Sequence, residues 1–120
     1  MTKRRVVITG MGAVTPLGHS VSKSWEAVRT GECGIAPITL FDTTGMKVSL
    51  AAEVKDWDPA AALGARESKH LARFTQFALA AAHEAMDDSG LILDVDKAER
   101  AGVIIGSGIG GVAETESQQM

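Results

Sequence analysis

Two short apolar runs constrain the fold of this chain more than any other feature. One spans residues 5–9 and the other residues 101–105, and both consist largely of β-branched residues. Neither run alternates with polar residues as a strand with one solvent-facing side does, so each predicts a strand buried on both faces of a parallel sheet. A glycine-rich turn follows each run. Since helical patterns separate the strands, the chain predicts an α/β layered architecture.

The rest of the chain supplies four helices and one further strand. A helix runs from a cap at Ser20 or Ser22 to about Thr30 and ends at Gly31, and residues 46–54 alternate as a half-buried strand. A short helix starts at Asp58-Pro59 and ends before Gly64, the longest helix spans about Ser68–Ser89 before Gly90, and another begins at Val112. Two buried strands need a sheet covered on both faces, which these elements only partly provide, so we expect residues 1–120 to be part of a larger domain.

Charge and composition argue against several classes of function. The net charge is −3 and aromatic residues make up 4% of the chain, which disfavours a nucleic-acid partner that needs basic patches and stacking platforms. No apolar stretch approaches the roughly 18 residues of a membrane span. The basic start at Lys3-Arg4-Arg5 lacks a suitable cleavage site after it, so we expect no secretory signal.

Cysteine and histidine offer little site chemistry. The single cysteine, Cys33, excludes an internal disulfide and a Cys-rich zinc site, and the local sequence offers no helix N-terminus or base to activate its thiol. The histidines His19, His70 and His83 lack the spacing of metal ligands. We therefore predict no metal site and treat Cys33 as a bystander.

The glycine loop after the second apolar run has two interpretations. Gly106-x-Gly108-x-x-Gly111 matches the dinucleotide-binding pattern, and it follows a predicted strand and precedes a predicted helix. The acidic residue that this pattern requires roughly 20 positions later does not occur within the 120 residues, and about a hundred residues precede the loop. A structural or substrate-facing turn is therefore the favoured alternative to a nucleotide site.

A basic cluster stands at the predicted start of the long helix. It consists of Arg66, Lys69, His70 and Arg73. Positive charge at a helix N-terminus is unfavourable for the helix dipole, which suggests a use other than stability. The cluster is either a solvated face or a docking site for an acidic partner.

Taken together, these segments resemble the elongating β-ketoacyl-[acyl-carrier-protein] synthases of the second type. The resemblance covers essentially the whole chain and rests on five stretches: residues 6–18, the Gly31–Ile35 turn with Trp25 before it and Phe41-Asp42 after it, Arg73-Phe74-Thr75-Gln76-Phe77-Ala78, Asp88-Ser89-Gly90-Leu91, and Gly106-Ser107-Gly108-Ile109-Gly110-Gly111. It favours a substrate-facing glycine loop over a nucleotide site. Ala72 stands where the family commonly has Asp, a departure that the sequence does not explain.

The resemblance implies a thiolase-like fold, an αβαβα layered sheet, of which residues 1–120 are the N-terminal part. It implies a cytoplasmic homodimer that needs no cofactor and joins an acyl group to malonyl-[acyl-carrier protein] by decarboxylative condensation, through a cysteine nucleophile and two histidines. The family places these three residues beyond position 120, so we expect the 120-residue chain alone to be inactive.

Two sites in this chain follow from the same resemblance. Ile109 and Gly108 match the part of the glycine loop that lines the acyl pocket. Arg66, Lys69 and His70 match positions that face the acyl carrier protein. A non-catalytic chain-length factor of polyketide synthesis remains an alternative, as does a nucleotide-binding α/β module.

Overall fold

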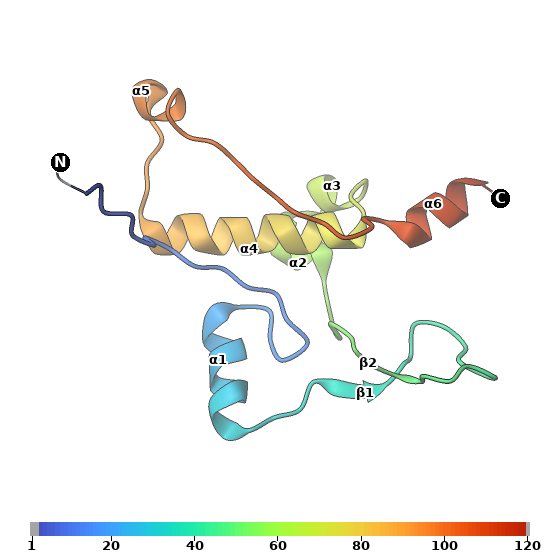
Figure 1. Ribbon diagram of the computed structural model, residues 1–120. Helices are drawn as coiled ribbons and strands as arrows, with labels where there is room; N and C mark the ends of the chain where they lie inside the picture. Colours follow the sequence, from blue (N-terminus) through green and yellow to red (C-terminus); the bar gives the residue numbers. More distant parts are fainter. Residues whose placement is uncertain (1–2, 120) are drawn as a thin grey trace.

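The computed structural model describes residues 3–119, which form six helices and two short strands (Figure 1). In chain order these are α1 (Val21–Thr30), β1 (Ile35–Pro37), β2 (Leu50–Ala52), α2 (Pro59–Leu63), α3 (Ala65–Ser68), α4 (Arg73–Ser89), α5 (Val95–Ala98) and α6 (Val112–Gln119). The long helix α4 lies at the centre of the molecule, and the other elements are arranged around it.

The helix boundaries follow the predicted caps. Ser20 begins α1 by accepting the Lys23 N–H at 3.3 Å, and Gly31 ends it with φ 75°, a conformation that favours glycine. Asp58 caps α2 with Pro59 in the first turn, and Gly90 ends α4 with φ 60°. The helix expected from Ser68 begins instead at Arg73, because Ala72 is extended with φ −59° and ψ 148°.

The two strands predicted from the apolar runs are wrong for this structure. Residues 5–9 and 101–105 lie outside any helix or strand, and their side chains face solvent, with Val6 95% and Ile104 98% exposed. Within residues 3–119 the sheet consists of β1 and β2 alone, paired antiparallel with Ile35 opposite Ala52. A strand needs a neighbouring strand to bond its backbone N–H and C=O groups, and within residues 3–119 no strand pairs with either run.

The strand predicted over residues 46–54 is confirmed only in its middle, since β2 covers Leu50–Ala52. The next residue, Glu53, stabilises the β1–β2 pair. The Glu53 carboxylate accepts hydrogen bonds from the Thr39 hydroxyl at 2.8 Å, the Thr39 N–H at 3.0 Å and the Leu40 N–H at 3.2 Å. These hydrogen bonds join the segment after β1 to the end of β2.

Little of the chain is buried. Ala27 and Leu63 are the buried hydrophobic residues among those described, and Ser68 is the buried polar one. The radius of gyration is 17.8 Å, whereas a closed domain of this length has about 14 Å. The layered sheet implied by the resemblance is therefore not closed within residues 3–119, and its apolar segments stay uncovered.

The N-terminal segment lies directly on α4. A Cβ atom at Gly10 would come within 2.1 Å of the Ala85 carbonyl oxygen, and one at Gly12 within 1.8 Å of the Ala81 carbonyl oxygen. Only glycine permits such an approach of two backbones. The small side chains of Ala81 and Ala85 give α4 the close-packing surface that its Ala-rich centre predicts.

Two carboxylates of α4 hold this segment by its backbone. Asp88 accepts the Met11 N–H at 2.9 Å, and Glu84 accepts the Ala13 and Val21 N–H groups, both at 2.9 Å. Acidic residues near a helix C-terminus oppose the dipole. Helix propensity alone does not explain an aspartate at position 88. The hydrogen bond from the Met11 N–H does explain it.

An aromatic cluster connects the segment before α2 to α4. The Trp57 ring meets the Phe77 ring edge-to-face at 5.1 Å and the His19 ring at 5.3 Å. Its indole N–H donates to Gln76 Oε1 at 3.0 Å, and the Arg73 guanidinium lies 5.0 Å from the Phe77 ring centre. These contacts pack the segment just before α2 against α4.

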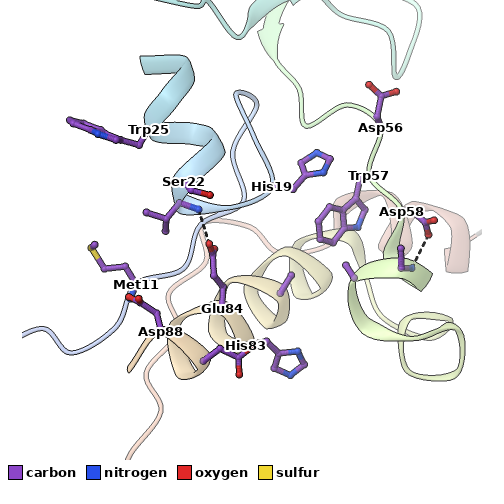
Figure 2. A pocket seen from close by; sticks show the side chains of 15 residues that line it. Met11, His19, Ser22, Trp25, Asp56, Trp57, Asp58, His83, Glu84 and Asp88 are labelled. Atoms are coloured by element: carbon purple, nitrogen blue, oxygen red, sulfur yellow. Dashed lines mark hydrogen bonds between the residues drawn. The ribbon is translucent and has the colours of Figure 1, made fainter. Parts of the chain in front are cut away.

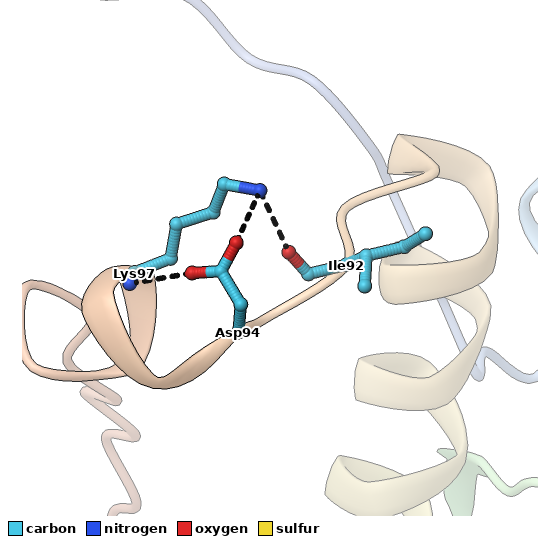
Figure 3. Close-up of polar contacts among 3 residues, drawn as sticks. All are labelled: Ile92, Asp94 and Lys97. Carbon is cyan, nitrogen blue, oxygen red and sulfur yellow. Dashed lines mark hydrogen bonds and ion pairs between the residues drawn. The ribbon is translucent and has the colours of Figure 1, made fainter.

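Helix α5 is a short turn held at its start by one carboxylate (Figure 3). Asp94 accepts the Lys97 N–H at 2.9 Å and pairs with the Lys97 ammonium at 3.0 Å, while that ammonium also donates to the Ile92 carbonyl at 3.3 Å. The segment that follows runs back along the length of α4 toward its N-terminal end and leads into α6 (Figure 1).

Candidate functional site

The two sites predicted from the sequence lie at the same end of α4. The basic residues Arg66, Lys69 and His70 come from α3 and the turn after it, which leads directly into α4. The glycine loop, residues 106–111, leads into α6, and its last two residues contact the first turn of α4. Figure 1 shows α3 and the start of α6 near the N-terminal end of α4.

The end of the glycine loop is packed and its middle is open. A Cβ atom at Gly110, where φ is 79°, would lie 3.6 Å from the Phe74 ring, and one at Gly111 would lie 3.3 Å from the Ala72 Cβ. At Gly106 and Gly108 such an atom would meet nothing within 4 Å. Ile109 stands in this open part with 87% of its surface exposed.

The basic cluster has three exposed basic residues and not the four that the sequence suggests. Arg66, Lys69 and His70 are exposed. Arg73 turns inward, where its guanidinium donates to the Val54 carbonyl at 2.5 Å and lies over the Phe77 ring. Arg73 therefore holds α4 to the segment after β2, and the docking prediction rests on the other three residues.

The remaining candidates show no catalytic arrangement. Cys33 is exposed, with its thiol 3.9 Å from the Ile35 carbonyl, and His19 Nε2 lies 2.9 Å from the Lys55 carbonyl. Across residues 3–119, no three His, Cys, Asp or Glu side chains gather closely enough to hold a metal ion. In the same residues, no helix combines the length and the hydropathy needed to cross a membrane.

Three carboxyl groups have altered acidity. The Thr44 hydroxyl, together with the Thr44 N–H, lowers the pKa of Asp42, and the Thr39 hydroxyl does the same for the pKa of Glu53. The Lys97 N–H, followed by its ammonium group, lowers the pKa of Asp94. Each of these carboxylates accepts a backbone N–H and so stabilises local structure. None of the three belongs to the glycine loop or the basic cluster.

A hollow of about 1150 Å³ opens between α1, α2 and α4 (Figure 2). Its walls include Trp25, Trp57, His83 and the carboxylates Glu84 and Asp88. No residue of the glycine loop or the basic cluster lines it. Sequence reasoning missed this hollow because its walls come from four separate segments of the chain. Two of its carboxylates, Glu84 and Asp88, accept backbone N–H groups of the N-terminal segment and α1.

Comparison with known proteins places this geometry in a family. The family described as beta-ketoacyl synthase, N-terminal domain, matches residues 3–120. The protein named 3-oxoacyl-[acyl-carrier-protein] synthase 2 of Coxiella burnetii is 49% identical over 112 residues, which are 93% of this chain and 27% of that protein. The protein of the same name from Synechocystis is 40% identical over 99% of this chain and 29% of its own length. The chain thus spans little more than a quarter of these relatives.

A solved structure supports the same assignment. The structure described as the ishigamide ketosynthase/chain length factor matches 76% of this chain and 23% of its own chain, with a TM-score of 0.63 and 38% identity. The fold is therefore α/β and thiolase-like, as the sequence predicts. With the family pattern matched from residue 3 to residue 120 and relatives identical at 40–49% of positions, this chain belongs to the β-ketoacyl synthase family.

Proposed function

We propose that residues 1–120 are the N-terminal part of a 3-oxoacyl-[acyl-carrier-protein] synthase of fatty-acid biosynthesis. The observation that carries this proposal is the 49% identity, over 93% of the chain, to a protein with that name. The domain boundary, the carrier-protein partner, the homodimer and the cytoplasmic location belong to the same proposal.

The proposed reaction has two halves. A cysteine thiolate attacks the acyl thioester of the carrier protein, and the carrier thiol leaves. Malonyl carrier protein then loses carbon dioxide, and the resulting carbanion attacks the acyl carbon on the enzyme, so that a carbon–carbon bond forms and the cysteine thiolate is released. The products are 3-oxoacyl carrier protein and carbon dioxide.

The catalytic cysteine and histidines of this proposal lie beyond residue 120. The surroundings of Cys33 support that placement, since among residues 3–119 the Ile35 carbonyl is the one polar contact of its exposed thiol. A nucleophilic thiol needs a helix N-terminus or a nearby base to lower its pKa. Residues 1–120 therefore contribute binding and positioning, and the 120-residue chain alone is inactive.

Two groups of residues in this part have assigned roles. Ile109 and Gly108 line the acyl pocket, a role that fits an apolar side chain standing in the open part of the glycine loop. Arg66, Lys69 and His70 bind the acidic carrier protein, a role that fits three exposed basic residues beside the start of α4. Long-range charge complementarity of this kind speeds the encounter of two proteins.

A second candidate function is that of a non-catalytic partner subunit. The observation that favours it is the solved structure with 38% identity, whose description names both a ketosynthase and a chain length factor. A chain-length factor shares the glycine loop and the α4 region but does not form an acyl-enzyme.

Acyl-enzyme formation separates the two functions. The complete polypeptide that carries residues 1–120 is incubated with acyl carrier protein thioester, and its mass is measured before and after malonyl carrier protein is added. A synthase gains one acyl group, then loses it as 3-oxoacyl carrier protein and carbon dioxide appear. The Cys33→Ser variant is the matched control and should behave identically. A polypeptide that never gains the acyl group is not the proposed synthase.

A further inference from the structure

Helix α4 begins without a side-chain cap of its own. Its N-cap residue is Ala72, whose methyl group accepts no hydrogen bond. The first hydrogen bond across this boundary runs from the Gln76 N–H to the Ala72 carbonyl at 3.0 Å. The N–H groups of Arg73, Phe74 and Thr75 therefore point out of the helix and need partners from elsewhere.

Glu114 supplies one of these partners from another helix. Its Oε1 accepts the Arg73 N–H at 3.3 Å, across 41 residues of sequence, and the contact is partly buried. Glu114 is the third residue of α6. One carboxylate thus lies at the N-terminal ends of both α4 and α6, where both helix dipoles favour a negative charge.

Gly111 makes room for this arrangement. A Cβ atom at Gly111 would lie 2.5 Å from Glu114 Oε2 and 3.3 Å from the Ala72 Cβ. Any side chain at this position would push the carboxylate away from the Arg73 N–H. The end of the glycine loop is therefore clamped between the first turn of α4 and the carboxylate that caps it.

We propose that Glu114 is a positioning residue of the acyl site. It fixes the end of the glycine loop on α4 and thereby sets the position of Ile109, which stands two residues before Gly111. This inference rests on the proposed function, because it assigns Glu114 an effect on chain-length selection through Ile109. Glu114 acts through the loop and does not itself contact the acyl group.

The competing explanation is that Glu114 only caps the N-terminus of α4 and does not position the glycine loop. A substitution at Ala72 can separate these two roles. Aspartate at position 72 would accept an N–H of the first turn of α4 from within the same helix, as N-cap residues do. It would not tie the glycine loop to α4. The double variant Glu114→Ala with Ala72→Asp therefore restores the cap without restoring the clamp.

The experiment compares four forms of the complete synthase: wild type, E114A, E114Q and the double variant E114A/A72D. Each is measured for thermal midpoint, for product chain-length distribution, and for KM and kcat with a series of acyl carrier proteins. We expect E114A to lower the midpoint, to broaden the product distribution, and to raise KM for the longest accepted acyl group about fivefold with a smaller change in kcat. E114Q, which keeps the accepting oxygen, should stay within about twofold of wild type.

The double variant decides the matter. We expect it to regain the wild-type midpoint and to keep the altered product distribution. If it regains both, Glu114 is a helix cap alone and the proposal is overturned. An unchanged product distribution in E114A would overturn it as well. Should E114A fail to fold, E114D takes its place, since its shorter side chain falls short of the Arg73 N–H.

Deuterium exchange keeps this test independent of the proposed function. If the wild-type polypeptide performs no condensation, the proposed function fails, but the clamp still predicts faster exchange of residues 106–111 in E114A and in the double variant. If residues 106–111 exchange at the same rate in all four forms, Glu114 does not clamp the glycine loop, and this conclusion holds whatever reaction the protein catalyses.

Discussion

The close approach of the N-terminal segment to α4 makes Gly12→Ala a sharp test of the packing. A methyl group at this position would lie 1.8 Å from the Ala81 carbonyl oxygen. Contacts of a Cβ atom below 3.0 Å are essentially absent from real structures, so the segment must move by more than 1 Å. Neither partner can yield by a side-chain rotation, because both are backbone.

The movement breaks the hydrogen bonds on either side of Gly12. The Met11 N–H donates to Asp88 and the Ala13 N–H donates to Glu84, each at 2.9 Å. A hydrogen bond to a charged acceptor contributes about 1.5 kcal/mol at the low end of its range, so the loss of both costs about 3 kcal/mol. That energy corresponds to about a hundredfold fall in local amide protection.

Hydrogen exchange of the Met11 and Ala13 amides in the complete polypeptide that carries residues 1–120 measures this directly. Gly102→Ala is the matched control, because a Cβ atom there meets nothing within 4 Å and its backbone is not in the left-handed region. We expect G102A to leave the protection of both amides unchanged and G12A to lower it about a hundredfold. Equal protection in the two variants would refute the close-packing argument.

Three further predictions concern the candidate sites and the β1–β2 ribbon. Reversing the charges at Arg66 and Lys69 should raise KM for acyl carrier protein about fivefold at low salt, and an unchanged KM with unchanged salt dependence would remove the docking role. Ile109→Phe should shift the products toward shorter acyl chains, and an identical product profile would place Ile109 outside the pocket. Because the Thr39 hydrogen bonds lower the pKa of Glu53 in the folded chain, their stabilisation is complete above its usual value of 4.5 and is lost as the pH falls through the lowered pKa. The hydrogen-exchange protection of the Thr39 amide should therefore fall in that acidic range, whereas in E53Q this protection should not depend on pH. If the protection of the Thr39 amide in the native chain does not change with pH, the assignment is contradicted.

Local signals in the sequence predicted four of the six helices within residues 3–119, namely α1, α2, α4 and α6, although α4 starts at Arg73 and not at Ser68. Gly31 and Gly90 end α1 and α4 in the left-handed conformation, and Asp58 starts α2, as their residue types indicate. These features depend on a few neighbouring residues, so the sequence contains all the information they need. The family, too, could be predicted from sequence motifs alone, and the match over residues 3–120 confirms it.

The strands were the failure, and the reason is non-local. The apolar runs at residues 5–9 and 101–105 have strand composition, but a strand exists only when another segment pairs with its backbone. Within residues 3–119 the side chains of both runs face solvent instead. The composition of the two runs therefore indicated a tendency to form strands, but no segment within residues 3–119 pairs with them.

The sequence by itself determined where α1 and α2 start, where α1 and α4 end, which loop is rich in glycine and which family the chain belongs to, because each depends on residue type and spacing. Only the tertiary structure decided the partners across the chain. In the structure the Arg73 guanidinium donates to the Val54 carbonyl and lies away from the basic cluster, Asp88 accepts the Met11 N–H, and Glu114 lies at the uncapped start of α4. These pairs are 19 to 77 residues apart in the sequence, and no local pattern encodes a contact whose partner is set by how whole helices come together.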